Sequence, residues 1–245
     1  MKKTKILTAA FLTFGFAPST FCSDWPVWGG NGSRNMISQE KKVVMDFNPG
    51  EMDDNEKVDL STTQNVKWVA KLGSQAYGNV TIGNGCVFVG TNNESPRDPK
   101  KKGDRGVVLC LDEKTGKLRW QLVIPKLGAG KVSDWEYIGV CSSPAIEGDK
   151  VYVVTNRCEV VCLDIHGLAN GNDGPYKQEA EYVKPKGMQD PLDDKMDADI
   201  LWMYDMRDEL GVFPHNVTSS SALIVGDRVY VATSNGVDWS HTNIP

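Results

Sequence analysis

Three stretches of this chain superimpose without gaps, and they constrain its fold more than any other feature. They are NGCVFVGTN from Asn84, GDKVYVVTN from Gly148 and GDRVYVATS from Gly226. In each, Asn-Gly or Gly-Asp supplies the positive φ that a two-residue hairpin turn needs. The β-branched and aromatic residues that follow are typical of a buried strand. Each stretch therefore predicts a hairpin, and we expect strands at 143–146 and 221–225 to precede two of them.

A second unit follows the hairpins and completes a repeat. It is VVLCLDEKTGKLRW from Val107 and, in shorter form, VVCLD from Val160. Asp112 and Gly116 frame another turn within it. Three expected strands end in tryptophan: Trp68, Trp120 and Trp202. Self-similar units of four antiparallel strands indicate an all-β fold, the β-propeller.

The spacing of the tryptophans shows where the repeat is interrupted. It is 52 residues from Trp68 to Trp120 and 82 from Trp120 to Trp202, whereas a four-stranded blade needs roughly 40 to 50. The excess falls in residues 97–106 and 167–199. Long loops on one rim of a propeller often carry binding surfaces. Solvated insertions without a function would account for these residues equally well.

The number of repeats falls short of a closed ring. About two and a half four-stranded units are present, whereas a propeller closes with roughly four to eight blades. We therefore expect either a C-terminally truncated piece of a longer protein or a ring completed by oligomerisation. Truncation is favoured because no capping sequence follows residues 235–239.

The unit from Leu109 to Trp120 resembles the repeat of quinoprotein-type, or PQQ-like, propellers. In that repeat a small residue precedes Leu-Asp, Thr-Gly-Lys follows, and a tryptophan closes the unit, as it does here. The resemblance covers the chain from about Asp24 to its end and is most specific at 107–120. Residues 25–30 and 33–35 also resemble the start of secreted bacterial propellers, many of them Planctomycete-like.

This resemblance implies one of two kinds of function. Some members are periplasmic or extracellular alcohol and sugar dehydrogenases that carry pyrroloquinoline quinone (PQQ) and Ca²⁺ on the propeller axis. Others, such as the propeller lipoprotein of the outer-membrane barrel assembly machine, are binding scaffolds without a cofactor. The repeat specifies the blade and not the site that is built on it.

The cysteines bear on that choice. The alcohol dehydrogenases of the family stack the quinone on a disulfide between two adjacent cysteines, and this chain has no adjacent pair. The repeats place Cys110 and Cys162 at one shared position, where we expect buried core residues. The aligned hairpins set Cys110 opposite Val87, so we expect Cys86 on the other face of the sheet and not bridged to Cys110.

We therefore expect a secreted propeller that acts as a non-catalytic binding or assembly scaffold in the periplasm or cell envelope. Its partner would be an envelope protein or a small molecule. The alternative is a PQQ- and Ca²⁺-dependent dehydrogenase whose remaining site residues lie in the absent blades. Some sugar dehydrogenases of the family lack the cysteine pair, so both hypotheses stay open.

Residues 164–174 combine oxygen-bearing side chains with glycines, as a calcium loop does. Four of them could ligate a hard cation: Asp164, Asn170, Asn172 and Asp173. The spacing is not that of an EF-hand, and Asx-Gly turns between two strands explain the same letters. Asp193, Asp194, Asp197 and Asp199 add negative charge to what we expect to be a solvated loop.

No catalytic residue can be assigned from the sequence. His166, His215 and His241 share no spacing that signals a metal site or a catalytic triad. Asp205 and Glu209 could form an acid–base pair, but a connection between blades explains that segment better, because nothing in the sequence shows that the two side chains face each other.

Two groups of residues mark places where a ligand could bind. One group precedes expected inner strands, where the axial ligands of a propeller lie: Tyr77, Asn79, Ser142 and Ser143. The other group raises a third hypothesis, a carbohydrate-binding rim: Trp135, Tyr137 and Trp239.

Residues 1–23 have the order of a bacterial secretory signal. Lysines come first, an apolar stretch from Ile6 to Phe16 follows, and small and polar residues end the segment. The stretch is too short to span a membrane. Cys22 would be acylated in a lipoprotein, although Phe21 is larger than the residue such signals have there.

An oxidising compartment would also allow a disulfide between Cys141 and Cys158.

The charge of the chain disfavours anionic partners. The formal net charge is −5, and removal of residues 1–23 takes three lysines and no acid, which makes it −8. An acidic protein repels polyanions, so nucleic acid is not an expected partner.

Overall fold

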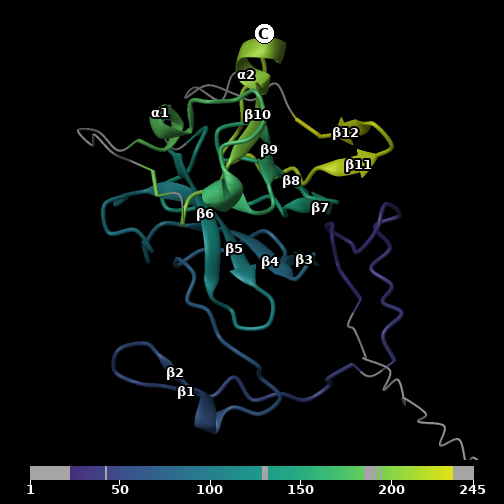
Figure 1. Cartoon of the computed structure of the whole chain (residues 1–245), viewed down its shortest axis with the longest axis vertical. Helices are drawn as coiled ribbons and strands as arrows, with labels where there is room; N and C mark the ends of the chain where they lie inside the picture. The colour runs from purple at the N-terminus through teal and green to yellow at the C-terminus, as the bar shows by residue number, and fades with distance from the viewer. Residues whose placement is uncertain (1–22, 42, 129–131, 185–191, 194, 234–245) are drawn as a thin grey trace, which may run out of the picture.

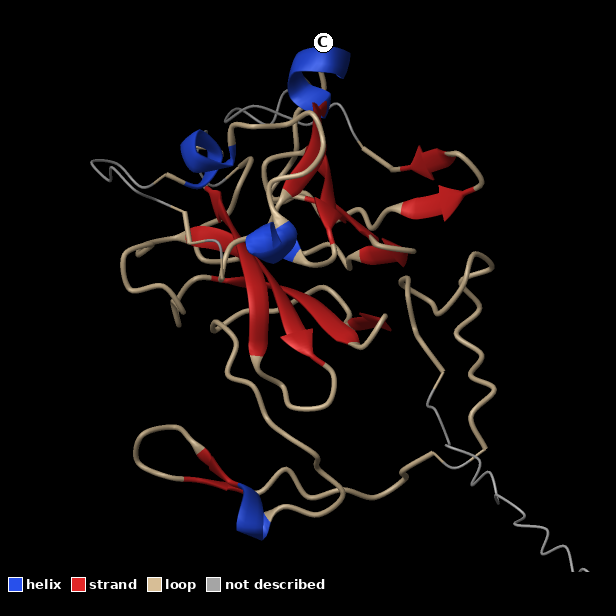
Figure 2. Cartoon of the chain, viewed as in Figure 1, coloured by secondary structure: helices blue, strands red, loops and turns tan. Residues whose placement is uncertain are grey.

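Two four-stranded antiparallel sheets and a further hairpin form the body of the molecule (Figures 1 and 2). The structure is a computed structural model that describes residues 23–41, 43–128, 132–184, 192–193 and 195–233. Blade 1 contains β3 (Thr81–Gly83), β4 (Cys86–Asn92), β5 (Arg105–Asp112) and β6 (Leu118–Pro125). Blade 2 contains β7 (Ala145–Glu147), β8 (Lys150–Val154), β9 (Glu159–Asp164) and β10 (Ile200–Asp205). The third hairpin contains β11 (Leu223–Val225) and β12 (Arg228–Tyr230).

The turns expected from the repeats are present. Asn84 and Gly85 both adopt positive φ, 52° and 70°, between β3 and β4. Gly148 and Gly226 also have positive φ and start the corresponding turns of the other two hairpins. Asp112 closes the fourth turn, because its carboxylate accepts hydrogen bonds from Thr115. Bonds from Arg119 and Thr115 lower the pKa of Asp112 to about 2.

The sheets are stacked face to face through continuous apolar cores. One face of blade 1 and one face of blade 2 share a core that includes Phe88, Trp120 and Val153. The other face of blade 2 packs on the third hairpin, and the other face of blade 1 packs on residues 68–72. Strands that are buried on both faces are expected to be apolar at nearly every position, as β4 and β5 are.

The innermost strands β3, β7 and β11 lie next to one another in succession, and the later strands of each blade follow in chain order. This is the arrangement of a β-propeller. The predicted all-β fold is therefore confirmed, with two complete blades and the first hairpin of a third. The five-residue helices α1 (Glu179–Val183) and α2 (Met206–Leu210) belong to connections.

Each blade contains the same row of side chains across its three long strands. In blade 1, Cys110 lies between Phe88 and Trp120, and the two rings are 5.8 Å apart. In blade 2, Cys162 lies between Tyr152 and Trp202, with rings 6.1 Å apart. The expectation that Cys110 and Cys162 are equivalent core residues is confirmed, since both are fully buried.

The predicted position of Cys86 is wrong. Cys110 is paired with Phe88 and not with Val87, so the ladder is shifted by one residue from the expected register. A shift of one residue moves a side chain to the opposite face of a sheet. Cys86 and Cys110 therefore lie in the same core, and their hydrogen bond, with burial, raises the pKa of Cys110. All five described cysteines are free, Cys141 and Cys158 included.

The prediction that the repeat tryptophans end strands is wrong. Trp120 and Trp202 are the third residues of β6 and β10, and Trp68 lies in a segment without a strand. What they share is a contact with a turn. Trp68 donates to the Glu113 carbonyl of blade 1 at 2.9 Å, and Trp120 donates to the equivalent carbonyl in blade 2, that of Ile165, at 2.7 Å.

Glycines in those turns permit the contact. A Cβ atom on Gly116 would lie 2.5 Å from the ring of Trp68, and one on Gly167 would lie 2.8 Å from the ring of Trp120. Neither distance leaves room for a side chain. The tryptophan of one repeat thus packs on the glycine turn of the next, which explains why the two occur together.

The two insertions are not solvated loops throughout. Lys101, in the connection between β4 and β5, is fully buried and forms an ion pair with Asp197, which is 1% exposed. Asp199 is also fully buried. Residues 196–198 bond to Gln121 of β6 through its backbone N–H and carbonyl, at 2.7 and 2.9 Å. The insertion of blade 2 therefore covers part of the outer edge of blade 1.

A short arm, residues 43–62, lies apart from the blades at the bottom of Figure 1. It contains β1 (Glu51–Met52), β2 (Val58–Asp59) and the 3₁₀ turn η1 (Leu60–Thr62). A second such turn, η2 (Gly167–Asn170), follows β9. Among the described residues, none of the helices has the length and apolar character needed to cross a bilayer.

Candidate functional site

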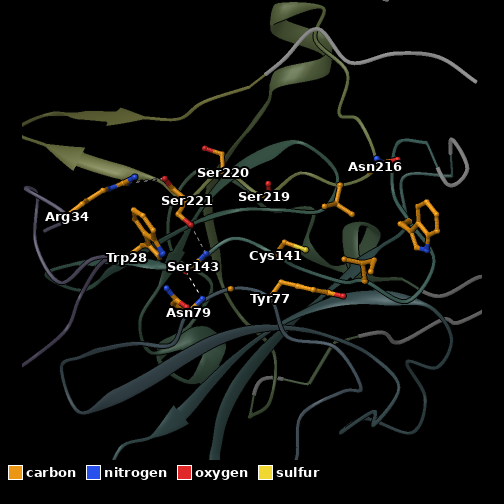
Figure 3. A pocket seen from close by; sticks show the side chains of 14 residues that line it. Trp28, Arg34, Tyr77, Asn79, Cys141, Ser143, Asn216, Ser219, Ser220 and Ser221 are labelled. Atoms are coloured by element: carbon orange, nitrogen blue, oxygen red, sulfur yellow. Dashed lines mark hydrogen bonds between the residues drawn. The ribbon is translucent and has the colours of Figure 1, made fainter. Parts of the chain in front are cut away.

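A cavity of about 670 Å³ opens where the innermost strands of the three sheets begin. Figure 3 shows Trp28 and Arg34 at one end of it and Asn216 at the other, with Ser143 and Cys141 between them. The lining residues come from four separate segments: Trp28, Arg34, Tyr77, Gly78, Asn79, Trp135, Ile138, Cys141, Ser143, Asn216, Val217, Ser219, Ser220 and Ser221.

Three equivalent residues form a chain of hydrogen bonds along one side of the cavity. Asn79, Ser143 and Ser221 each stand two residues before an innermost strand. The backbone N–H of Asn79 donates to Oγ of Ser143 at 2.8 Å, and the N–H of Ser143 donates to Oγ of Ser221 at 2.9 Å (Figure 3). Each sheet is thus joined to the next at the wall of the cavity.

Gly78 allows the first of these joints to form. A Cβ atom there would lie 2.5 Å from the carbonyl oxygen of Ser142. Ser142 itself points elsewhere, since its hydroxyl donates to the carbonyl of Val154 at 2.6 Å. Of the four residues that the sequence placed before inner strands, the structure therefore brings Tyr77, Asn79 and Ser143 to the cavity and leaves Ser142 in the core.

The N-terminal segment, residues 24–34, runs past all three sheets. Trp25 forms a two-way backbone bridge with Ile82 of β3, and the Pro26 carbonyl accepts from Ile146 of β7 at 2.7 Å. Arg34 reaches the third hairpin, where Nη2 donates to the Ser221 and Ala222 carbonyls, both at 3.1 Å. This segment supplies one end wall of the cavity.

Arg34 and Trp28 were not expected as site residues. The Arg34 guanidinium lies over the Trp28 ring, 5.4 Å from its centre, in the geometry of a cation–π contact. The sequence signal was the resemblance of residues 25–30 and 33–35 to the start of secreted propellers. That resemblance marks the segment but does not show that it meets a hairpin 187 residues further along the chain.

Comparison with known proteins places these repeats in a family. The family model described as outer membrane protein assembly factor BamB matches residues 60–238. The chain belongs to this family of PQQ-like repeat propellers. No curated protein matches it. Among solved structures, a similar one is a europium-containing methanol dehydrogenase, at 12% identity and a TM-score of 0.45. The match covers 88% of this chain and 28% of the dehydrogenase, so the chain spans little more than a quarter of that length.

The described lining of the cavity does not contain the carboxylates that Ca²⁺ prefers. Calcium takes six to eight oxygen ligands, among which carboxylates are prominent. None of the described residues that line this BamB-family cavity is Asp, Glu or His. Burial raises the pKa of the Cys141 thiol to about 11, with Asp134 adding to the effect, so this thiol stays protonated at neutral pH. The described lining therefore offers hydrogen bonds, aromatic faces and one guanidinium, and it contains no carboxylate and no imidazole.

The proposed calcium loop is held together by its own contacts. Asp164 accepts from the His166 N–H at 2.7 Å. Lys177 donates to the Asn172 side chain at 2.6 Å and to the Asp173 carbonyl at 3.1 Å, and Asn170 donates to Asp173. An ammonium thus occupies oxygen atoms that a cation would need. Calcium binding there stays a prediction.

Three further candidates lie away from the cavity. Asp205 caps α2, where it accepts from the N–H of Arg207 at 2.9 Å, and Glu209 is exposed on that helix. His166 is exposed, and no group of three His, Cys, Asp or Glu among the described residues could hold a metal ion. His241, Trp239, Cys22 and the secretory signal lie outside the described residues.

Proposed function

We propose that this chain is part of a non-catalytic binding scaffold that acts in the cell envelope. One observation carries the proposal: the cavity at the inner ends of the sheets is lined by aromatic, amide and hydroxyl groups, with no Asp, Glu or His among the described lining residues. Oxidation of an alcohol needs a base that removes the hydroxyl proton. A lining of this kind offers a ligand hydrogen bonds and aromatic contacts, and none of its described residues is a carboxylate or an imidazole that would take that proton.

The family supports the location and the class of activity. Its model is described as an outer membrane protein assembly factor, and we propose the same compartment for this chain, reached through the secretory signal at residues 1–23. Lipidation at Cys22 belongs to the same hypothesis. The exported chain would then meet envelope proteins.

The arm supports a protein partner. Six large apolar side chains are more than half exposed on it: Val43, Val44, Met45, Phe47, Met52 and Leu60. Exposed apolar side chains that gather on one segment mark interaction sites more often than scattered ones do. We propose that this arm contacts the envelope partner.

The alternative, a quinone-dependent dehydrogenase, is tested directly. The full-length protein is titrated with PQQ and Ca²⁺, and dye reduction is followed with a panel of alcohols and aldoses. We expect no spectral change of the quinone and no dye reduction. Reduction of the dye with any of these substrates would overturn the scaffold hypothesis.

The partner hypothesis needs its own experiment. A photo-crosslinking residue replaces Phe47 in the arm or, as the control, Tyr204, which is exposed on β10. We expect one envelope protein to be crosslinked in intact cells from Phe47 and not from Tyr204. The same product from both positions, or none from Phe47, would contradict a role for the arm.

A further inference from the structure

The walls of the cavity present three aromatic rings from three distant segments. Trp28 comes from the N-terminal segment, Tyr77 from the approach to blade 1, and Trp135 from the connection between the blades. Tyr77 is 60% exposed and Trp135 is 45% exposed. The Arg34 guanidinium lies over the Trp28 ring, so Tyr77 and Trp135 supply most of the accessible aromatic surface. Aromatic rings with a polar edge are suited to ligands that are partly apolar and partly hydrated.

The remaining polar groups of the cavity are neutral and versatile. Asn79, Asn216, Ser219 and Ser220 are amides and hydroxyls, which both donate and accept hydrogen bonds. Arg34 is the single charged residue of the described lining. Its Nη2 donates to two backbone carbonyls, whereas its buried Nε has no hydrogen-bond partner and can still donate to a ligand oxygen. The described lining therefore consists of neutral amides and hydroxyls with one cationic donor, which fits a ligand rich in hydroxyl groups.

We propose that this cavity binds a neutral oligosaccharide. The inference rests on the proposed scaffold function and names the ligand class of the same cavity. A sugar ring has apolar C–H faces, which pack on aromatic rings, and an equatorial belt of hydroxyls, which amides and serines satisfy. A volume of about 670 Å³ lies within the roughly 300–1,000 Å³ of cavities that hold small ligands. The net charge of −8 that remains without residues 1–23 disfavours acidic polysaccharides.

An extended peptide fits the cavity less well. Peptides that bind by strand addition need unpaired backbone groups at a sheet edge. Here the N–H groups of Asn79 and Ser143 already donate to serine hydroxyls, and Ile82 and Ile146 bond to the N-terminal segment. The inner edges of β3 and β7 are thus occupied.

Binding is tested on the full-length protein without quinone. Maltotriose, cellotriose and tri-N-acetylchitotriose are the probes, and calorimetry and tryptophan fluorescence are the readouts. We expect saturable binding of at least one trisaccharide with a change in fluorescence, because Trp28 and Trp135 line the cavity. An extended peptide of mixed aromatic and polar residues should not bind.

Variants locate the binding site. Trp135→Ala and, separately, Tyr77→Ala should each weaken the affinity by roughly three- to tenfold, and Trp135→Phe should keep most of it. Tyr77 is so exposed that its replacement leaves the fold intact. Tyr137→Ala is the matched control, since Tyr137 is 48% exposed, stands two residues from Trp135 and does not line the cavity.

The outcomes separate this inference from the function it rests on. Failure of all three trisaccharides to bind, binding of the peptide in their place, or unchanged affinity in both alanine variants would overturn the oligosaccharide proposal and leave the scaffold intact. Binding followed by dye reduction with the bound sugar would overturn the scaffold instead.

Discussion

Blades 1 and 2 are built on the same plan but carry their additional residues at different places. Blade 1 has its insertion between the second and third strands, and blade 2 has its insertion between the third and fourth. The strands of blade 1 are also longer, with eight residues in β5 and β6 against six in β9 and β10. The shared aromatic row fixes the blade, and the insertions fix how one blade meets the next.

The two insertions join to each other. Nζ of Lys101, from the insertion of blade 1, lies 2.6 Å from Oδ2 of Asp197, from the insertion of blade 2. Asp98 adds a second carboxylate 3.7 Å from the same ammonium. The comparison shows that additional residues in a repeat can hold neighbouring repeats together, besides offering surface for binding.

The largest effect should come from the tryptophan row. Trp120 is 1% exposed and its indole bonds to blade 2, whereas Trp202 is only half-buried. We expect Trp120→Ala to lower the free energy of unfolding by about 3–5 kcal/mol, and Trp202→Ala by about 1–2 kcal/mol. Urea denaturation of the two variants measures both free energies of unfolding. Equal losses would show that the contact of Trp120 with blade 2 adds nothing to stability.

The next effect should come from the ion pair between the insertions. Lys101→Met leaves the buried Asp197 carboxylate without its partner, which should cost about 3 kcal/mol. The double variant Lys101→Met, Asp197→Leu should recover most of that loss, because it removes both charges. Lys100→Met is the control, since Lys100 is exposed. If thermal and urea unfolding show the single and double variants equally destabilised, the charge pair is not the cause.

A smaller effect should distinguish the two serine joints. Ser221→Ala leaves the N–H of buried Ser143 without an acceptor, which should cost about 1–2 kcal/mol. Ser143→Ala leaves the N–H of Asn79, an exposed residue, where water replaces the hydroxyl at less than half of that cost. Hydrogen exchange at the Ser143 and Asn79 amides, measured in both variants, identifies which joint has opened.

The smallest effect concerns pH. Burial raises the pKa of Asp199 to about 6, and Glu179, Asp164 and Asp173 add to the shift. Because the folded pKa exceeds the unfolded value of 3.8, Asp199 favours folding below pH 4, and this contribution is lost as the pH rises through 6. Asp199→Asn should therefore melt roughly 2–4 °C above the original protein at pH 7.5, with the difference closing near pH 4. A constant difference would exclude titration of Asp199 as its source.

The sequence predicted those parts of the fold that depend on local chemistry. The hairpins at Asn84, Gly148 and Gly226 follow from turn residues that only a few conformations accept, and the equivalence of Cys110 and Cys162 follows from the repeat. The register of β4 and β5 could not be predicted in the same way. Residues 93–104 separate those strands, and a connection of that length does not fix which residue faces which.

The cavity was predicted only in part, for a related reason. Tyr77, Asn79 and Ser143 precede inner strands, which is visible in the repeat. Arg34 lines the cavity only because the N-terminal segment runs along three sheets. The course of that segment depends on contacts with distant residues, so no local sequence pattern predicts it. No local pattern predicts that Lys101 is buried, since its partner Asp197 lies 96 residues away.

The chain of bonds from Asn79 through Ser143 to Ser221 has a consequence for how such proteins grow. The donor in each joint is a backbone N–H, which every residue except proline supplies, and only the acceptor is a side chain. A duplicated blade would therefore already contain the N–H donor of this joint. It would need only one hydroxyl, at one position, as the acceptor. Gene duplication could therefore add a blade to such a chain without a matched pair of mutations at this joint.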